Sequence, residues 1–153
     1  MGFSDNQIEL IDSIRGFFTN ERIKFINWNY CKIGPTGGGN IEGWLERELD
    51  YYLEKNGYKT RPKKQREADL MFEVEEEIDW EKSIEIRTGS HPSSSWIINK
   101  ITLNNSRGIH PLYMYLYVPS PRTLDTIRKK TKQLGLAVKE YPLAEKLMLI
   151  FIH

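Results

Sequence analysis

The chain contains segments with apolar residues at helical spacing and segments in which apolar and polar residues alternate. Apolar positions three or four residues apart predict helices over about 5–19, 41–55 and 123–134. Alternation of apolar and polar residues, which gives a period of two, predicts strands. Segment 24–28 is expected to be a short extended piece. Segment 96–103 fits a strand or a helix. Strands are expected over 58–62, 68–75, 83–88, 112–118, 137–141 and 146–152.

Turn-forming residues separate these segments. Asn56-Gly57 is expected to end the second helix and Gly135 the third, because glycine commonly follows the last residue of a helix. The glycine-rich stretch 34–40 predicts a flexible loop that lacks the ending of a Walker motif. The acidic stretch 75–79 lies between two strand segments and predicts the turn of a hairpin.

This order of elements predicts an α/β fold with a central mixed sheet flanked by helices. A length of 153 residues suits a single domain over 1–153. Within it, 1–40 would hold the first helix and the glycine-rich loop, 41–135 the core, and 136–153 the last strands. The predicted core beneath the site consists of Leu49, Leu53, Leu70, Phe72, Ile84, Ile86, Leu116 and Val118.

Composition and charge exclude several classes of protein. Hydrophobic residues make up 39% and charged residues 28%, as in globular proteins and unlike disordered ones. The net charge of +1 is lower than usual for a protein that coats nucleic acid without sequence preference, but it does not exclude nucleic acid, because acidic residues in a metal site would offset basic residues around it. No apolar run is long enough to span a bilayer, so no membrane association is expected. A lone cysteine, Cys31, permits no internal disulfide, so a cytoplasmic location is expected.

The candidate functional residues lie mainly on the predicted hairpin. Glu85 and Arg87 are two residues apart on one strand and share a face, and the hairpin places Asp69 opposite residues 85–87. Two carboxylates on one sheet face can share a hard divalent cation such as Mg²⁺. Glu46 lies beside the apolar stripe of the preceding helix and is the preferred helical acid, with Glu42, one turn earlier, as the alternative. A surface ladder of ion pairs is the simpler interpretation of the same residues.

Four short stretches together resemble the core of the PD-(D/E)XK nucleases. The resemblance spans about residues 41–135 and is greatest to the archaeal Holliday junction resolvase branch. It implies a restriction-endonuclease-like fold and a metal-dependent DNA endonuclease that uses Mg²⁺ or Mn²⁺. The stretches are Glu46-Arg47-Glu48-Leu49, Asn56-Gly57-Tyr58, Ala68-Asp69-Leu70 and Ser83-Ile84-Glu85-Ile86-Arg87-Thr88.

The resemblance also implies residue roles. Asp69 and Glu85 would be metal ligands, and the main-chain carbonyl of Ile86 would complete the protein's share of the metal coordination. Glu46 would be the helical acid. DNA would be the partner, and the family's frequent dimers suggest a homodimer. Arg87 stands where the family has lysine, and Ala68 where it has proline.

Arginine at position 87 sets the alternative function. A guanidinium, whose pKa exceeds about 12, cannot act as a base, although it can bind a phosphate and stabilise developing charge. Lys82 does not replace the missing lysine, because its odd spacing from Glu85 turns it to the other face of the strand. The alternative is therefore a catalytically inactive nuclease-like module that binds DNA or a protein.

Other features have simpler interpretations. Tyr113, Tyr115 and Tyr117 share one strand face, which more often packs under a helix than stacks on unpaired bases. The basic run at 122–132 is usually a solvated helix face, with phosphate contact as the alternative. The three histidines lack metal-ligand spacing with Cys31, and no neighbour suggests an activated thiol: His91, His110 and His153.

Overall fold

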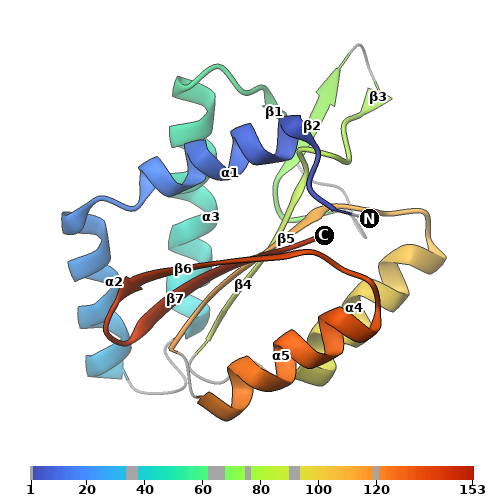
Figure 1. Cartoon of the computed structure of the whole chain (residues 1–153). Coiled ribbons are helices and arrows are strands. Elements are labelled where there is room, and N and C mark those ends of the chain that lie inside the picture. Colours follow the sequence, from blue (N-terminus) through green and yellow to red (C-terminus); the bar gives the residue numbers. More distant parts are fainter. Residues whose placement is uncertain (1, 34–37, 62–67, 75–76, 90–93, 119–120) are drawn as a thin grey trace.

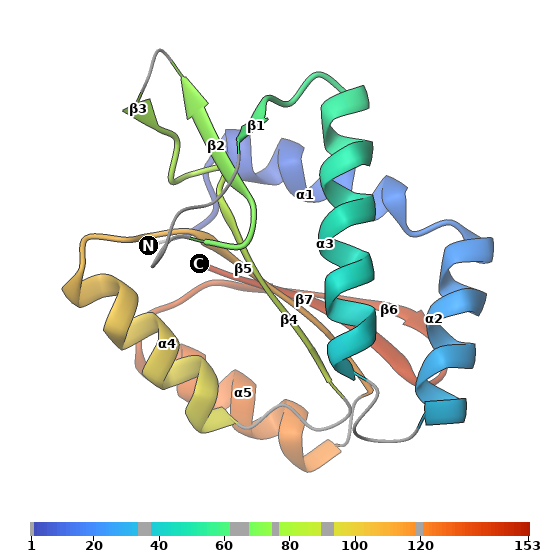
Figure 2. The same cartoon turned by 180° about the vertical axis from the view of Figure 1, so that it is seen from behind.

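The computed structural model describes residues 2–33, 38–61, 68–74, 77–89, 94–118 and 121–153. Helices lie on both faces of a twisted sheet, with α1, α2 and α3 on one face and α4 and α5 on the other (Figures 1 and 2). The mixed α/β architecture predicted from the sequence is therefore confirmed. The helices are α1 Asp5–Phe17, α2 Asn20–Ile33, α3 Gly38–Lys55, α4 Ser94–Ser106 and α5 Pro121–Gln133.

The strands form two small sheets joined at one point. β4 and β5 are parallel, while β5 with β7 and β7 with β6 are antiparallel, in the order β4-β5-β7-β6. The order of the antiparallel sheet is β1-β2-β3, and a bridge between Leu70 and Ile84 links it to β4. The strands are β1 Thr60–Arg61, β2 Met71–Val74, β3 Glu77–Ile78, β4 Ile84–Gly89, β5 Leu112–Tyr117, β6 Val138–Ala144 and β7 Leu147–Ile152.

Alternation along the strands produces two hydrophobic cores. Even-numbered residues of β4 and β5, such as Ile86 and Met114, pack against α1 and α3, whereas Tyr113, Tyr115 and Tyr117 pack against α4 and α5. The predicted core is confirmed: of its eight residues, all are buried except Val118, which is partly buried. The tyrosine row packs under helices, so it is not a platform for unpaired bases.

Helix boundaries follow local chemistry. The Ser4 hydroxyl accepts a hydrogen bond from the Gln7 amide, and the Gln7 side chain accepts one from the Ser4 amide, which closes a capping box at α1. Gly57 ends α3 and Gly135 ends α5, both with positive φ, as their positions in the sequence predict. At Gly57, the following Tyr58 amide donates to the Leu53 carbonyl, so one of the last carbonyls of α3 is satisfied.

Two predictions about the first half of the chain were wrong. Segment 24–28 is helical within α2, which the Thr19 hydroxyl caps by accepting from the Arg22 amide. Phe25 and Trp28 are exposed, so the apolar pattern there does not mark the buried face. The predicted loop 34–40 extends too far, because α3 begins at Gly38; residues 34–37 lie outside the described residues.

The structure also shows the form of the predicted hairpin and of segment 96–103, which fitted either a strand or a helix. β2 turns into the short β3, and 79–83 leads back to β4, so the connection is a small hairpin followed by a second turn. This small hairpin projects from the sheet (Figure 1). Segment 96–103 belongs to α4, which connects the parallel strands β4 and β5. Such a helical crossover is the usual connection between parallel neighbours.

Two tyrosines of β5 give a matched stability prediction. Tyr113 Oη accepts a hydrogen bond of 3.0 Å from buried Asn104, whereas the buried Tyr117 Oη has no hydrogen-bond partner within the described residues. Burial raises the pKa of each phenol to about 12, so both stay protonated at neutral pH. Tyr113→Phe is expected to cost about 1–2 kcal/mol, and Tyr117→Phe to be neutral or slightly stabilising. Urea unfolding of the two variants tests this, and equal losses would contradict it.

Candidate functional site along strand β4

Asp69 lies against the edge of β4 that faces away from β5. Leu70 and Ile84 exchange two backbone hydrogen bonds of 2.9 Å, and this antiparallel register places Asp69 opposite Glu85. Asp69 Oδ2 accepts a hydrogen bond of 2.7 Å from the Ile86 amide. The carboxylate predicted from the hairpin register is therefore held at the strand that carries Glu85.

A second carboxylate reaches the same edge two residues further along. Glu42 Oε2, from the first turns of α3, accepts hydrogen bonds from the Thr88 amide at 3.1 Å and from the Thr88 hydroxyl at 3.3 Å. Asp69 and Glu42 thus satisfy successive amides on this side of β4. Both carboxylates are partly buried.

The Ile86 carbonyl lies between these two contacts. In a strand, the N–H and C=O of one residue point to the same edge, and the edge alternates from residue to residue. The Ile86 and Thr88 amides both point away from β5, so the Ile86 carbonyl points that way from a position between them. Two carboxylates and one main-chain carbonyl therefore line this edge.

Glu85 points to the other face of the sheet, toward α4. Its side chain is 9% exposed, and its Oε1 lies 3.4 Å from Lys100 Nζ, whose side chain is 32% exposed. A buried carboxylate is costly without a compensating charge, and the α4 lysine supplies one. Lys100 was not among the predicted site residues, because segment 96–103 was not assigned to a helix from the sequence.

Arg87 shares the face of Glu85 and is exposed. It lies opposite Tyr115 of β5 in the parallel register. Burial raises the pKa of the Tyr115 phenol, and the Arg87 charge partly opposes that rise. The guanidinium is thus close enough to this tyrosine for the two to interact electrostatically.

The two helical acids occupy successive turns of α3. Glu42 makes the contacts with Thr88 described above, and Glu46 lies one turn further along, partly buried. Glu46 was the preferred acid from the sequence, and its role stays a prediction. What the pattern left open was which turn of α3 comes close to β4, and this depends on how the helix packs.

These positions predict unequal effects for the two acids. Glu42→Gln is expected to reduce DNA nicking about 10-fold or more, because it removes a charge beside the Ile86 carbonyl; Glu46→Gln is expected to have the smaller effect. Single-turnover nicking rates of both variants, with their melting temperatures as folding controls, test the order. A larger loss for Glu46→Gln would support Glu46 as the helical acid.

The donor set suits a hard divalent cation. Among the described residues, no three Asp, Glu, His or Cys side chains gather into a group that could hold an ion by themselves. Mg²⁺ does not need such a group, because it commonly uses one or two carboxylates, retains several waters and takes oxygen from a substrate phosphate. Asp69, Glu42 or Glu85, and the Ile86 carbonyl are ligands of the required chemistry.

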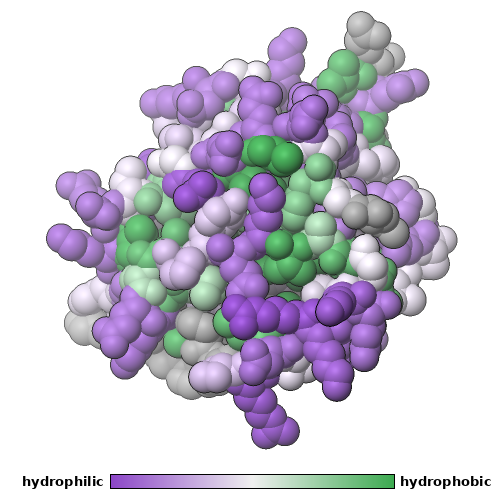
Figure 3. All heavy atoms as spheres, viewed as in Figure 1, coloured by the Kyte–Doolittle hydropathy of each residue, from purple (hydrophilic) through white to green (hydrophobic). Residues whose placement is uncertain are grey.

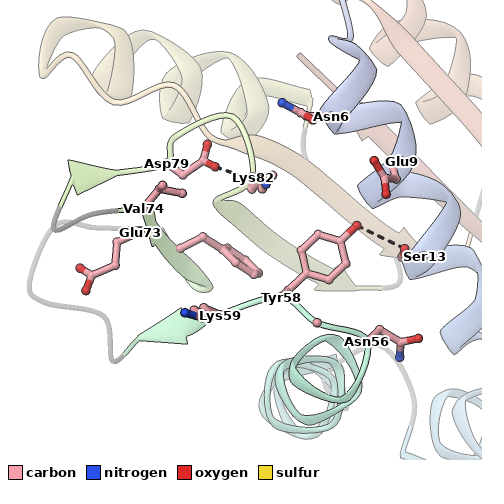
Figure 4. Close-up of a pocket in the computed structure, with 12 residues that line it drawn as sticks. Asn6, Glu9, Ser13, Asn56, Tyr58, Lys59, Glu73, Val74, Asp79 and Lys82 are labelled. Atoms are coloured by element: carbon pink, nitrogen blue, oxygen red, sulfur yellow. Dashed lines mark hydrogen bonds and ion pairs between the residues drawn. The ribbon is translucent and has the colours of Figure 1, made fainter.

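A cavity lies elsewhere in the described part of the protein. It has a volume of about 410 Å³ between α1, the end of α3 and the β2–β3 hairpin (Figure 4). Lys82 lines it and forms an ion pair of 3.7 Å with Asp79, so Lys82 lies away from Glu85, as expected. None of the predicted site residues lines this cavity. Ser13 and Tyr58 both line this cavity, and their hydroxyl groups form a hydrogen bond with each other.

The remaining candidates from the sequence that the structure describes lie outside the site. His110 is exposed and contacts Asn105, while His91 and the Cys31 side chain lie outside what the structure describes. Hydrophilic side chains cover α5, where Arg128 is paired with Asp125 and Glu140 (Figure 3). This pairing is typical of a solvated helix face.

The described helices include none that is long and apolar enough to cross a membrane. Comparison with protein-family models, with curated proteins and with solved structures finds no match for this chain.

Proposed function

We propose that the protein is a metal-dependent DNA endonuclease with a restriction-endonuclease-like core. One observation carries the proposal. Asp69 accepts a hydrogen bond from the Ile86 amide at the edge of the strand that carries Glu85, so this acid lies beside the Ile86 carbonyl, which supports the roles that the resemblance implies. A ladder of surface ion pairs would not require an aspartate to bond to the backbone of the neighbouring strand.

The order of elements supports the same proposal. A helix with inward acids, α3, precedes the antiparallel strands β1 and β2, and the bridge to β4 follows. The segment that resembles the nucleases therefore forms a connected helix-and-strand unit, and α4 and β5 extend it on the other side.

Each residue has a chemical role in this proposal. A bound Mg²⁺ or Mn²⁺ would polarise the phosphodiester and lower the pKa of a nearby water. Asp69, Glu85 and the Ile86 carbonyl would hold that ion, with Glu42 or Glu46 as the helical acid. Arg87 would bind the scissile phosphate, because its planar guanidinium matches phosphate oxygens and stabilises developing negative charge.

The substrate and the setting follow from the same chemistry. DNA is the proposed partner, and the exposed lysines of α5 are candidates for contact with its phosphates. A homodimer is proposed because cutting both strands of a duplex takes two active sites. A lone cysteine remains consistent with the reducing cytoplasm.

The first test is whether the wild-type protein nicks DNA. We expect slow, Mn²⁺-favoured conversion of supercoiled plasmid to the open circle, lost when EDTA removes the ion. Duplex, single-stranded and branched DNA substrates should be assayed in parallel with Mg²⁺ and Mn²⁺. Binding without cleavage of any of them would favour the catalytically inactive module instead.

A further inference from the structure

Lys100, on α4, forms an ion pair with Glu85. Its Nζ lies 3.4 Å from Glu85 Oε1, on the sheet face that also carries Arg87. Position 87 holds an arginine that cannot release a proton, and Lys82 is paired with Asp79 at the cavity beside α1 and the β2–β3 hairpin. The ammonium group absent from the strand is therefore present on the following helix.

The position of Lys100 is determined by the packing of α4. Asn104, one helical turn after Lys100, is buried and donates a hydrogen bond of 3.0 Å to Tyr113 Oη. Tyr113 is the register partner of Glu85 on β5. Residues four apart lie on the same face of a helix, so the anchor at Asn104 directs Lys100 toward Glu85.

We propose that Lys100 supplies the ammonium group that the strand motif lacks, and that it acts at the same site as Asp69, Glu85 and Arg87. A carboxylate has two oxygens and about four acceptor sites, so Glu85 can serve an ammonium and a cation together. An ammonium has three donors, which lets Lys100 bond Glu85 while it orients a water or contacts a phosphate oxygen. This inference rests on the proposed nuclease function.

The test separates a role at the reacting groups from a role in stability. Lys100→Met removes the charge and keeps the length, and Lys100→Gln keeps a donor to Glu85 without the charge. A third variant combines Lys100→Met with Arg87→Lys and moves the ammonium to the strand. Lys146→Met, at an exposed lysine in the β6–β7 turn, is the matched control.

Two readouts are expected to change in opposite directions. Removing a positive charge beside Glu85 should tighten Mn²⁺ binding about 5-fold, measured by calorimetry without DNA. The same variants should nick plasmid about 100-fold more slowly, because the loss of one positioned donor that stabilises charge in the transition state costs on that scale. The double variant should recover at least about a tenth of the wild-type rate, whereas Lys146→Met should match the wild type in both.

The outcomes distinguish this inference from the function on which it rests. Wild-type nicking with undiminished rates in Lys100→Met and Lys100→Gln overturns the role of Lys100 and leaves the nuclease intact. Slow variants with unchanged Mn²⁺ affinity and no recovery in the double variant show a structural role and also overturn it. If the wild type does not cleave any DNA, the nuclease proposal and this inference fall together.

Discussion

Asp69→Asn is expected to lower Mn²⁺-dependent nicking by at least about 1000-fold, since metal-ion catalysis supplies several kcal/mol and about 1.4 kcal/mol is a tenfold change in rate. The asparagine retains an oxygen that can accept from the Ile86 amide, so the fold should be preserved. Only the charge that attracts a cation is removed. Plasmid nicking under single-turnover conditions measures the loss.

The same substitution should remove the effect of the metal on stability. A cation at about 100 times its dissociation constant adds about 2.7 kcal/mol to the free energy of unfolding, provided that it binds only the folded protein. For a chain of this size, that raises the wild-type melting temperature by about 5–10 °C. Asp69→Asn combined with Glu85→Gln should show no such rise.

The matched control is Asp12→Asn, in which the same change is made at an exposed aspartate of α1. Its ion pair with Arg15 lies on the surface and contributes little to stability. It should keep both the nicking rate and the metal-induced rise. A wild-type melting curve that Mn²⁺ leaves unchanged would instead support the interpretation of these acids as an ion-pair ladder.

The second large effect is expected at Arg87. Arg87→Ala should reduce nicking by about 100-fold or more, because the loss of one group that stabilises transition-state charge costs about 3 kcal/mol. Arg87→Lys should retain or raise activity, since it restores the residue that the resembling nucleases carry. Both variants are expected to fold normally, because the side chain is exposed.

Arg107→Ala, at an exposed arginine just beyond the end of α4, is the control for general loss of positive charge. It should leave the rate within about two-fold of the wild type, as expected for a surface substitution away from the site. Equal losses in Arg87→Ala and Arg107→Ala would indicate nonspecific attraction to DNA rather than a phosphate clamp. An active Arg87→Ala would remove Arg87 from the site altogether.

Local signals in the sequence were sufficient for much of the fold. The apolar spacing along α3 and the glycine that ends this helix, Gly57, are both local features, so neither signal depends on a residue far away in the sequence. The register of Asp69 against Glu85 was also predictable, because antiparallel strands near one turn have a nearly constant sum of residue numbers. These features depend on chain geometry alone.

Signals that depend on packing were misleading. Segment 24–28 looked extended because its aromatic residues, Phe25 and Trp28, do not mark the buried face of α2. The cap at Thr19 was the available signal for this helix, since its hydroxyl accepts from the Arg22 amide. Periodicity finds a helix only when apolar residues coincide with the buried face.

The sequence by itself determined most of the strands, the glycines that end α3 and α5, and the approach of Asp69 to the strand segment 85–87. Only the tertiary structure decided that Glu42 contacts β4 and that Lys100 reaches Glu85 from α4. Both contacts join residues whose separation is set by how a helix lies on the sheet. Spacing along one element determines which side chains share a face, but the approach of two elements depends on the packing of every residue between them.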